Sequence, residues 1–160
     1  HHSYLDISLL LADLQRYDTA ETFYRDVIRE AHHLPLKAQA YMGIGHLEMR
    51  KGNYLSAADA YQEARSFDPH AGEIQFYVAL AWFQAGKHEH AISFFEKAAN
   101  KELTASFLFA YLAQAHKAVA NSELAEWLFR EAVALSPDRD FYWYELGNLL
   151  LDNRQYYQAA

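Results

Sequence analysis

The chain has no cysteine, and only three prolines and six glycines occur among its 160 residues. Without cysteine it can form no disulfide, and thiolate nucleophiles and cysteine-ligated zinc are excluded from this segment. The scarcity of proline and glycine leaves room for long helices and argues against a turn-rich β fold. Because missing cysteines are compatible with reducing and oxidising compartments alike, the sequence leaves a cytoplasmic and a periplasmic location open.

Positive charge is also scarce: the chain has 14 Lys and Arg against 21 Asp and Glu, and its net charge is −7. A nucleic-acid partner is therefore not expected, because binding to a phosphate backbone needs a positive surface. No apolar run approaches the roughly 18 residues needed to span a bilayer, so we expect no membrane insertion in this segment. What the chain does have is 52% apolar residues, enough for a continuous core.

An internal repeat organises these apolar residues. In four places an alanine is followed four positions later by a ring: Ala20 and Tyr24, Ala57 and Tyr61, Ala91 and Phe95, Ala125 and Phe129. The alanines, continued by Ala159, are spaced 37, 34, 34 and 34 residues apart. A fixed period of this length is typical of stacked helical hairpins.

The front half of each copy carries a second pattern. Trp143, Leu146 and Gly147 form W-x-x-L-G, and the equivalent triplets are Tyr41-Ile44-Gly45, Gln75-Val78-Ala79 and Phe109-Leu112-Ala113. On these two patterns the chain resembles the tetratricopeptide repeat (TPR) family over essentially residues 1–160. The resemblance implies an all-α fold, a right-handed superhelical α-solenoid of stacked antiparallel helix pairs.

The expected repeats are 1–37, 38–71, 72–105, 106–139 and a truncated fifth copy at 140–160, which suggests a fragment of a longer protein. In the second copy the helices are expected at about 38–50 and 54–66, separated by a turn at Gly52. The first copy has about three extra residues around Ala31–Leu34, expected to lengthen its second helix or the loop that follows. The residues expected to pack the repeats are Ala20, Tyr24, Gly45, Ala57, Tyr61, Ala91, Phe95, Ala125, Phe129, Trp143 and Gly147.

The resemblance further implies that the first helix of each pair lines a concave groove. The side chains expected there are Met42, His46, Met49, Phe76, Leu80, Phe83, Ala110, Gln114, Lys117, Tyr144 and Asn148, with Leu5 and Leu9 in the first copy. Methionine and aromatic side chains suit adaptable contacts with an apolar peptide or helix. Alternatively, Phe76, Leu80 and Phe83 simply pack on the next hairpin. Lys117 and Asn148 are not arranged as the clamp with which some family members hold a terminal carboxylate.

Catalysis is not expected. Nine histidines are present, but neither His32-His33 nor His88-x-His90 has a spacing that directs two imidazoles to one helical face. There is no glycine-rich phosphate loop and no nucleophile elbow. The sequence therefore predicts no catalytic residues, no metal site and no cofactor.

Three functions remain open. The first is a protein–protein interaction scaffold that binds a peptide or helix of a partner in the groove, within a larger bacterial assembly or secretion protein. The second is self-association into a homo-oligomer through array ends that leave Trp143, Leu146 and Leu150 uncovered. The third is a regulatory domain that senses a peptide.

Overall fold

The computed structural model describes residues 16–100 and 105–159, and side chains as far as Arg154. Within these residues the chain forms eight helices and no strand. The helices are α2 (Tyr17–Glu30), α3 (Leu34–Lys51), α4 (Tyr54–Phe67), α5 (Gly72–Gln84), α6 (His88–Ala99), α7 (Ser106–Ala118), α8 (Ser122–Leu135) and α9 (Asp140–Ala159). No helix in the described ranges combines the length and hydropathy that crossing a bilayer requires.

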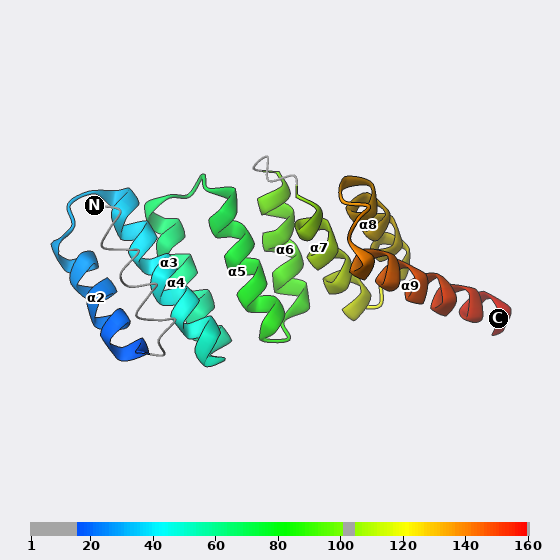
Figure 1. The fold of residues 1–160 in the computed structure, drawn as a ribbon, viewed down its shortest axis with the longest axis horizontal. Helices are drawn as coiled ribbons and strands as arrows, with labels where there is room; N and C mark the ends of the chain where they lie inside the picture. The colour runs from blue at the N-terminus through cyan, green and yellow to red at the C-terminus, as the bar shows by residue number, and fades with distance from the viewer. Residues whose placement is uncertain (1–15, 101–104, 160) are drawn as a thin grey trace.

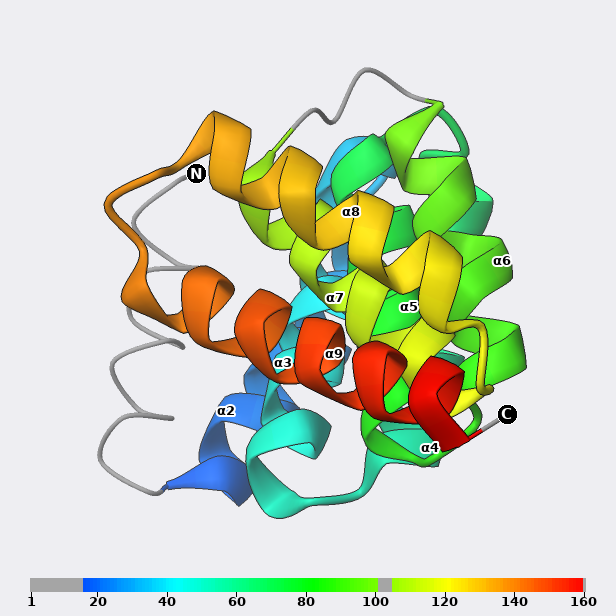
Figure 2. The same ribbon diagram turned by 90° about the vertical axis from the view of Figure 1, so that its right-hand side faces the viewer.

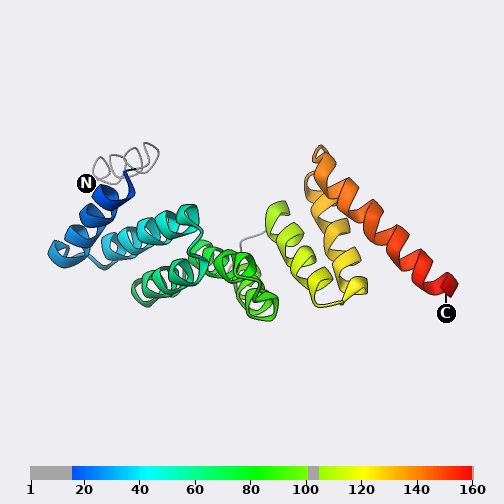
Figure 3. The same cartoon turned by 90° about the horizontal axis from the view of Figure 1, so that it is seen from below.

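The helices follow one another along the long axis of the molecule, with α2 and α9 at opposite ends of the described array (Figure 1). Each helix contacts the next, and the closest pairs are α3 with α4, α5 with α6 and α7 with α8. Seen from the C-terminal end, α9 lies nearest to the viewer, with α8 beside it (Figure 2). Seen from below, α7 and α8 run side by side as one such pair (Figure 3). The expected all-α solenoid of helix pairs is confirmed.

The three hairpin turns share one backbone geometry. Gly52 and Gly86 follow α3 and α5 with φ of 79° and 77°, and Ala120 follows α7 with φ of 61°. After each of them, the next residue donates its N–H to a carbonyl in the last turn of the first helix, at 2.9 Å in all three. This left-handed C-cap satisfies carbonyls that the helix end leaves unpaired. Ala120 adopts the same left-handed conformation as the two glycines, although it carries a Cβ.

The extra residues of the first copy lie elsewhere than expected. Helix α2 ends at Glu30 and has 14 residues, as α4 and α8 do. Helix α3 begins at Leu34 and has 18 residues, against 13 for α5 and α7. The insertion therefore extends the first helix of the second copy at its N-terminus. Pro35 permits this start, because the first turn of a helix needs no N–H donor there.

Rings pack against small residues at the hairpin contacts. The ring of Tyr61 lies so close to Gly45 that a Cβ on this glycine would overlap it, and the ring of Tyr24 lies against Gly43 in the same way. The first contact joins α3 to its own partner helix α4, and the second joins α3 to α2. Gly45 was anticipated as a close-approach site, whereas Gly43 was not.

The rings of the second helices are enclosed. Phe95 is 0% exposed and its ring centroid lies 5.7 Å from that of Phe76 on α5 and 6.0 Å from that of Tyr111 on α7. It therefore fills the space between one hairpin and the next. The other expected packing residues of α2, α3, α4, α6 and α8 are buried as well.

In α9 the expected packing residues are instead accessible. Trp143 is 52% exposed, and a Cβ placed on Gly147 would meet nothing within 4 Å. In α3 the equivalent positions are covered by α4, because the Tyr41 ring stacks on that of Phe67 and the Tyr61 ring lies against Gly45. Among the described residues, no such helix follows α9.

Candidate functional site

The first helices of the pairs contact one another through side chains. The ring of His46 on α3 lies 4.7 Å from that of Tyr77 on α5, measured between centroids. The Phe76 ring of α5 lies 5.8 Å from the Tyr111 ring of α7. Between α7 and α9, Lys117 Nζ lies 3.2 Å from a carboxylate oxygen of Glu145. Helices α3, α5, α7 and α9 therefore form a continuous surface, here called the first-helix face.

The side chains predicted for the groove differ in how much of them solvent can reach. Tyr144 is 66% exposed, whereas Phe76 and Ala110 are only 7% and 3% exposed. The remaining predicted residues are partly exposed: Met42, His46, Met49, Leu80, Phe83, Gln114, Lys117 and Asn148. Leu5 and Leu9 lie outside the described residues. A partner on this face could therefore reach most of the predicted set.

Phe76 is a packing residue. Its ring contacts the rings of Phe95, Phe107 and Tyr111, at centroid distances of 5.7, 5.0 and 5.8 Å. Phe76 therefore packs on the next hairpin, which is the alternative interpretation given above for this residue. Leu80 and Phe83 also pack against the same core but keep part of their surface accessible.

A polar cluster joins α3, α4 and α5 beside these apolar residues. The Tyr61 hydroxyl and His46 Nδ1 share a hydrogen bond of 2.8 Å, and the Tyr77 ring stacks on that of Tyr61 at 5.5 Å. Burial lowers the pKa of His46. Burial likewise raises the pKa of Tyr61, and the neighbouring Tyr77 adds to this effect. Both groups are therefore neutral at pH 7, and the cluster presents no charge from these two side chains.

His116 is a second histidine withdrawn from solvent. It is 7% exposed, and neither of its ring nitrogens has a hydrogen-bond partner among the described residues. Burial lowers its pKa, and the charge of Glu96 opposes that change without reversing it. The structure therefore gives His116 the surroundings of an apolar side chain.

Lys117 is engaged within the array. Its ammonium pairs with Glu145 on α9 at 3.2 Å, so its charge is already balanced.

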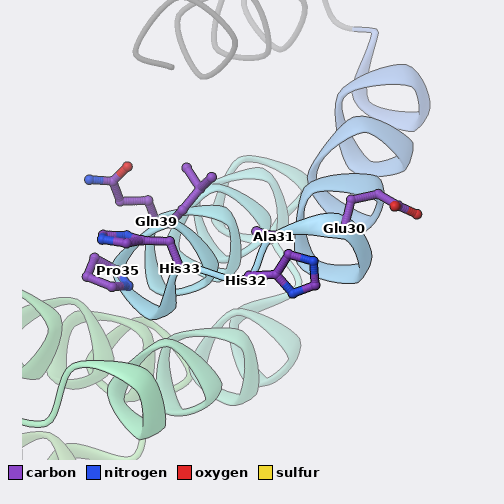
Figure 4. A pocket seen from close by; sticks show the side chains of 7 residues that line it. Glu30, Ala31, His32, His33, Pro35 and Gln39 are labelled. Carbon is purple, nitrogen blue, oxygen red and sulfur yellow. The ribbon is translucent and has the colours of Figure 1, made fainter.

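Clefts interrupt the described surface at several places. One, of about 540 Å³, lies at the α2–α3 connection and is lined by His32, His33 and five neighbouring residues. Figure 4 shows the two imidazoles pointing to opposite sides, so they cannot ligate one ion together. No group of three or more His, Asp or Glu side chains in the described ranges could hold a metal ion.

The second cleft, of about 330 Å³, includes Met42 and His46 of the first-helix face together with Asp68 and Glu73. The third, of about 320 Å³, lies between α2, α3 and α4 and is lined by ion-paired side chains such as Glu21 and Arg25. The hydrogen bond from Arg25 is the main cause of a lowered pKa at Glu21. Of the three, only the second opens on the predicted groove.

Sequence reasoning missed several of these contacts. The bond between His46 and Tyr61 joins residues 15 positions apart, and only the hairpin brings them together. The pair of Glu48 and Lys51, three residues apart on α3, was visible as a spacing that favours an ion pair. The hydrogen bond from Lys51 to Glu48 is the main cause of a raised pKa at the lysine.

Comparison with known proteins identifies relatives of this architecture. Residues 5–71 and 44–105 match the family model described as tetratricopeptide repeat. No curated protein sequence matches the chain significantly.

Three solved structures illustrate the similarity. YrrB, described as a TPR protein with an unusual peptide-binding site, superposes with a TM-score of 0.78 at 16% identity, over 94% of this chain and 76% of that one. MamA from Desulfovibrio magneticus RS-1 gives a TM-score of 0.85 at 15% identity, over 99% and 88% of the two chains. The first TPR domain of Spaghetti (RPAP3), bound to the HSP90 peptide SRMEEVD, gives 0.72 at 21% identity, over 78% and 99%.

Proposed function

The chain belongs to the tetratricopeptide repeat family, and from this premise we propose that it is a protein-interaction scaffold. Its first-helix face holds a peptide or helix of a partner protein, as one component of a larger bacterial assembly or secretion protein. YrrB is described as having a peptide-binding site, and the RPAP3 domain is bound to a peptide. Both descriptions support a peptide as the ligand of this fold.

The observation that carries the proposal is the row of accessible apolar side chains on the first-helix face. Met42 of the second repeat and Leu80 and Phe83 of the third are partly exposed, and Tyr144 of the fifth is exposed. Exposed apolar groups aligned on a rigid surface favour a ligand that buries them. Because the helices are already formed, the scaffold loses little conformational freedom when it binds.

A matched pair of double variants tests this assignment. Leu80→Gln with Leu151→Gln changes the first-helix face, and Leu55→Gln with Leu135→Gln changes second helices at side chains that are 55% and 52% exposed. Peptides selected from a random phage-displayed library on the unaltered protein provide the ligands. We expect the first double variant to weaken their binding by about tenfold or more, which corresponds to a loss of about 1.4 kcal/mol of binding free energy.

The second double variant should bind these peptides as the unaltered protein does. Circular dichroism checks that both variants keep their helices. Equal losses in the two variants, or a loss only in the second, would contradict the proposal.

Self-association is a second candidate, favoured by the exposed residues of α9. Phe141, Trp143, Tyr144 and Leu151 are 51%, 52%, 66% and 60% exposed. Leu146, which was expected to be uncovered as well, is buried at 5% exposed, because it packs in the core cluster with α8. Light scattering at several concentrations tests this candidate, since a mass independent of concentration would exclude it.

A further inference from the structure

One cleft on the first-helix face combines an apolar floor with an acidic rim. It has a volume of about 330 Å³ and lies between α2, α3, the α4–α5 connection and the start of α5. Tyr24, Ala38 and Ile74 line it with side chains that are 2%, 4% and 5% exposed. We call it the acidic cleft, for the two carboxylates described next.

Asp68 and Glu73 also line this cleft, and no lysine or arginine does. Neither carboxylate forms an ion pair within the described residues, in contrast to Glu21, Glu48, Glu126 and Glu145. His46, the remaining titratable group of the lining, has its pKa lowered by burial and is neutral at pH 7. The cleft therefore carries two negative charges that no described side chain of its lining balances.

We propose that the acidic cleft receives a lysine or arginine side chain of the bound segment, next to an apolar side chain held by Met42, which lines the same cleft. This inference rests on the proposed function and specifies the chemistry of the partner. A lysine or arginine suits the cleft because its methylene stem packs on apolar surface while its charged end reaches the rim. Charge-assisted hydrogen bonds to carboxylates are the stronger class of hydrogen bond.

Three fluorescein-labelled peptides of equal length serve as probes, with leucine alternating with lysine, glutamine or glutamate. Fluorescence anisotropy at physiological ionic strength gives their dissociation constants. We expect the lysine peptide to bind about tenfold more tightly than the glutamine peptide, and the glutamate peptide to bind most weakly. The double variant Asp68→Asn with Glu73→Gln should bind the lysine peptide no more tightly than the glutamine peptide.

A matched control separates the cleft from the general attraction of an acidic protein for cations. Glu89→Gln with Asp138→Asn removes one glutamate and one aspartate, both exposed and outside the cleft. Glu89 lies in the first turn of α6 as Glu73 lies in the first turn of α5, so both variants lose the same interaction with a helix N-terminus. The control should keep the preference for lysine.

The outcomes distinguish this inference from the proposed function. Equal loss of the preference in both double variants, or no preference in the unaltered protein, would overturn the acidic cleft. If the lysine peptide is not preferred, but the glutamine peptide binds and Leu80→Gln with Leu151→Gln weakens it, the groove assignment stands while the cleft fails. An unaltered protein that binds none of the three peptides contradicts the inference directly, and the library-selected peptides then decide the proposed function separately.

Discussion

At the scale of single residues, stability depends on rings enclosed between hairpins. Phe95 is 0% exposed and contacts both α5 and α7 through the rings of Phe76 and Tyr111. Tyr61 is equally enclosed and contacts α3 and α5. A repeat hairpin cannot bury its own apolar face, so these rings supply contacts to two hairpins at once.

Phe95→Ala should therefore lower the free energy of unfolding by about 3–5 kcal/mol, from lost burial and the cavity left behind. Urea denaturation followed by circular dichroism measures the change. Phe141→Ala is the control, because this ring is 51% exposed and its removal should cost less than about 1 kcal/mol. Similar losses in the two variants would show that Phe95 is not a packing centre.

His116 makes stability depend on pH. Its pKa is lowered by burial in the folded state, so the unfolded chain takes up a proton first as pH falls through the ordinary histidine value of about 6.5. The pH-dependent part of the free energy of unfolding that comes from His116 is therefore fully present above that pH and is lost as pH falls below it. Burial lowers the pKa of His46 too, in the same direction.

In His116→Leu we expect a higher melting temperature at pH 7.5, because two unpartnered buried nitrogens are removed, with a gain of about 1–3 kcal/mol. The fall in melting temperature from pH 7.5 to pH 5.5 should also be smaller than in the unaltered protein. Differential scanning fluorimetry at both pH values measures this. An unchanged pH dependence would contradict the assignment to His116.

At the scale of elements, the hairpin turns decide where each first helix ends. Gly52 and Gly86 adopt the left-handed conformation at no steric cost, whereas Ala120 adopts it with φ of 61° against the repulsion of its Cβ. The two glycines were recognisable as helix ends in the sequence. Ala120 was not, because alanine ordinarily continues a helix.

Ala120→Gly should raise the free energy of unfolding by about 0.5–1 kcal/mol. The substitution removes the steric repulsion of a left-handed alanine, and the greater conformational freedom of glycine in the unfolded chain offsets only part of this gain. Ala134→Gly is the matched control, since Ala134 is an exposed alanine inside α8. There the same substitution should lower stability by up to about 1 kcal/mol. Chemical denaturation of both variants checks the opposite signs.

At the scale of the whole molecule, helices differ in how many neighbours cover them. Helix α5 contacts α4, α6 and α7, whereas α9 packs chiefly on α8. In a repeat array, local stability follows these nearest-neighbour contacts. We therefore expect the slowest amide exchange in α5 and α7 and faster exchange in α9. Hydrogen–deuterium exchange with mass spectrometry measures this order, and equal protection in α5 and α9 would contradict it.

The sequence by itself determined the repeat and the fold. The small residues and rings at their regular spacing predicted the helix pairs, because an amphipathic helix must bury one face and the ring must meet a small partner. The expected helices at 38–50 and 54–66 correspond to α3 and α4, which span Leu34–Lys51 and Tyr54–Phe67. The longer α3 was missed, since a proline near Leu34 suits a helix start and a loop equally.

Only the tertiary structure decided how far each predicted groove residue is exposed and which charges are already paired. Phe76 turned out to be buried and Lys117 to be paired with Glu145, while Asp68 and Glu73 border one cleft without a cationic partner in the described ranges. The physical reason is that helical periodicity fixes the face on which a side chain lies. What that face meets depends on the stacking of hairpins that are distant in the chain.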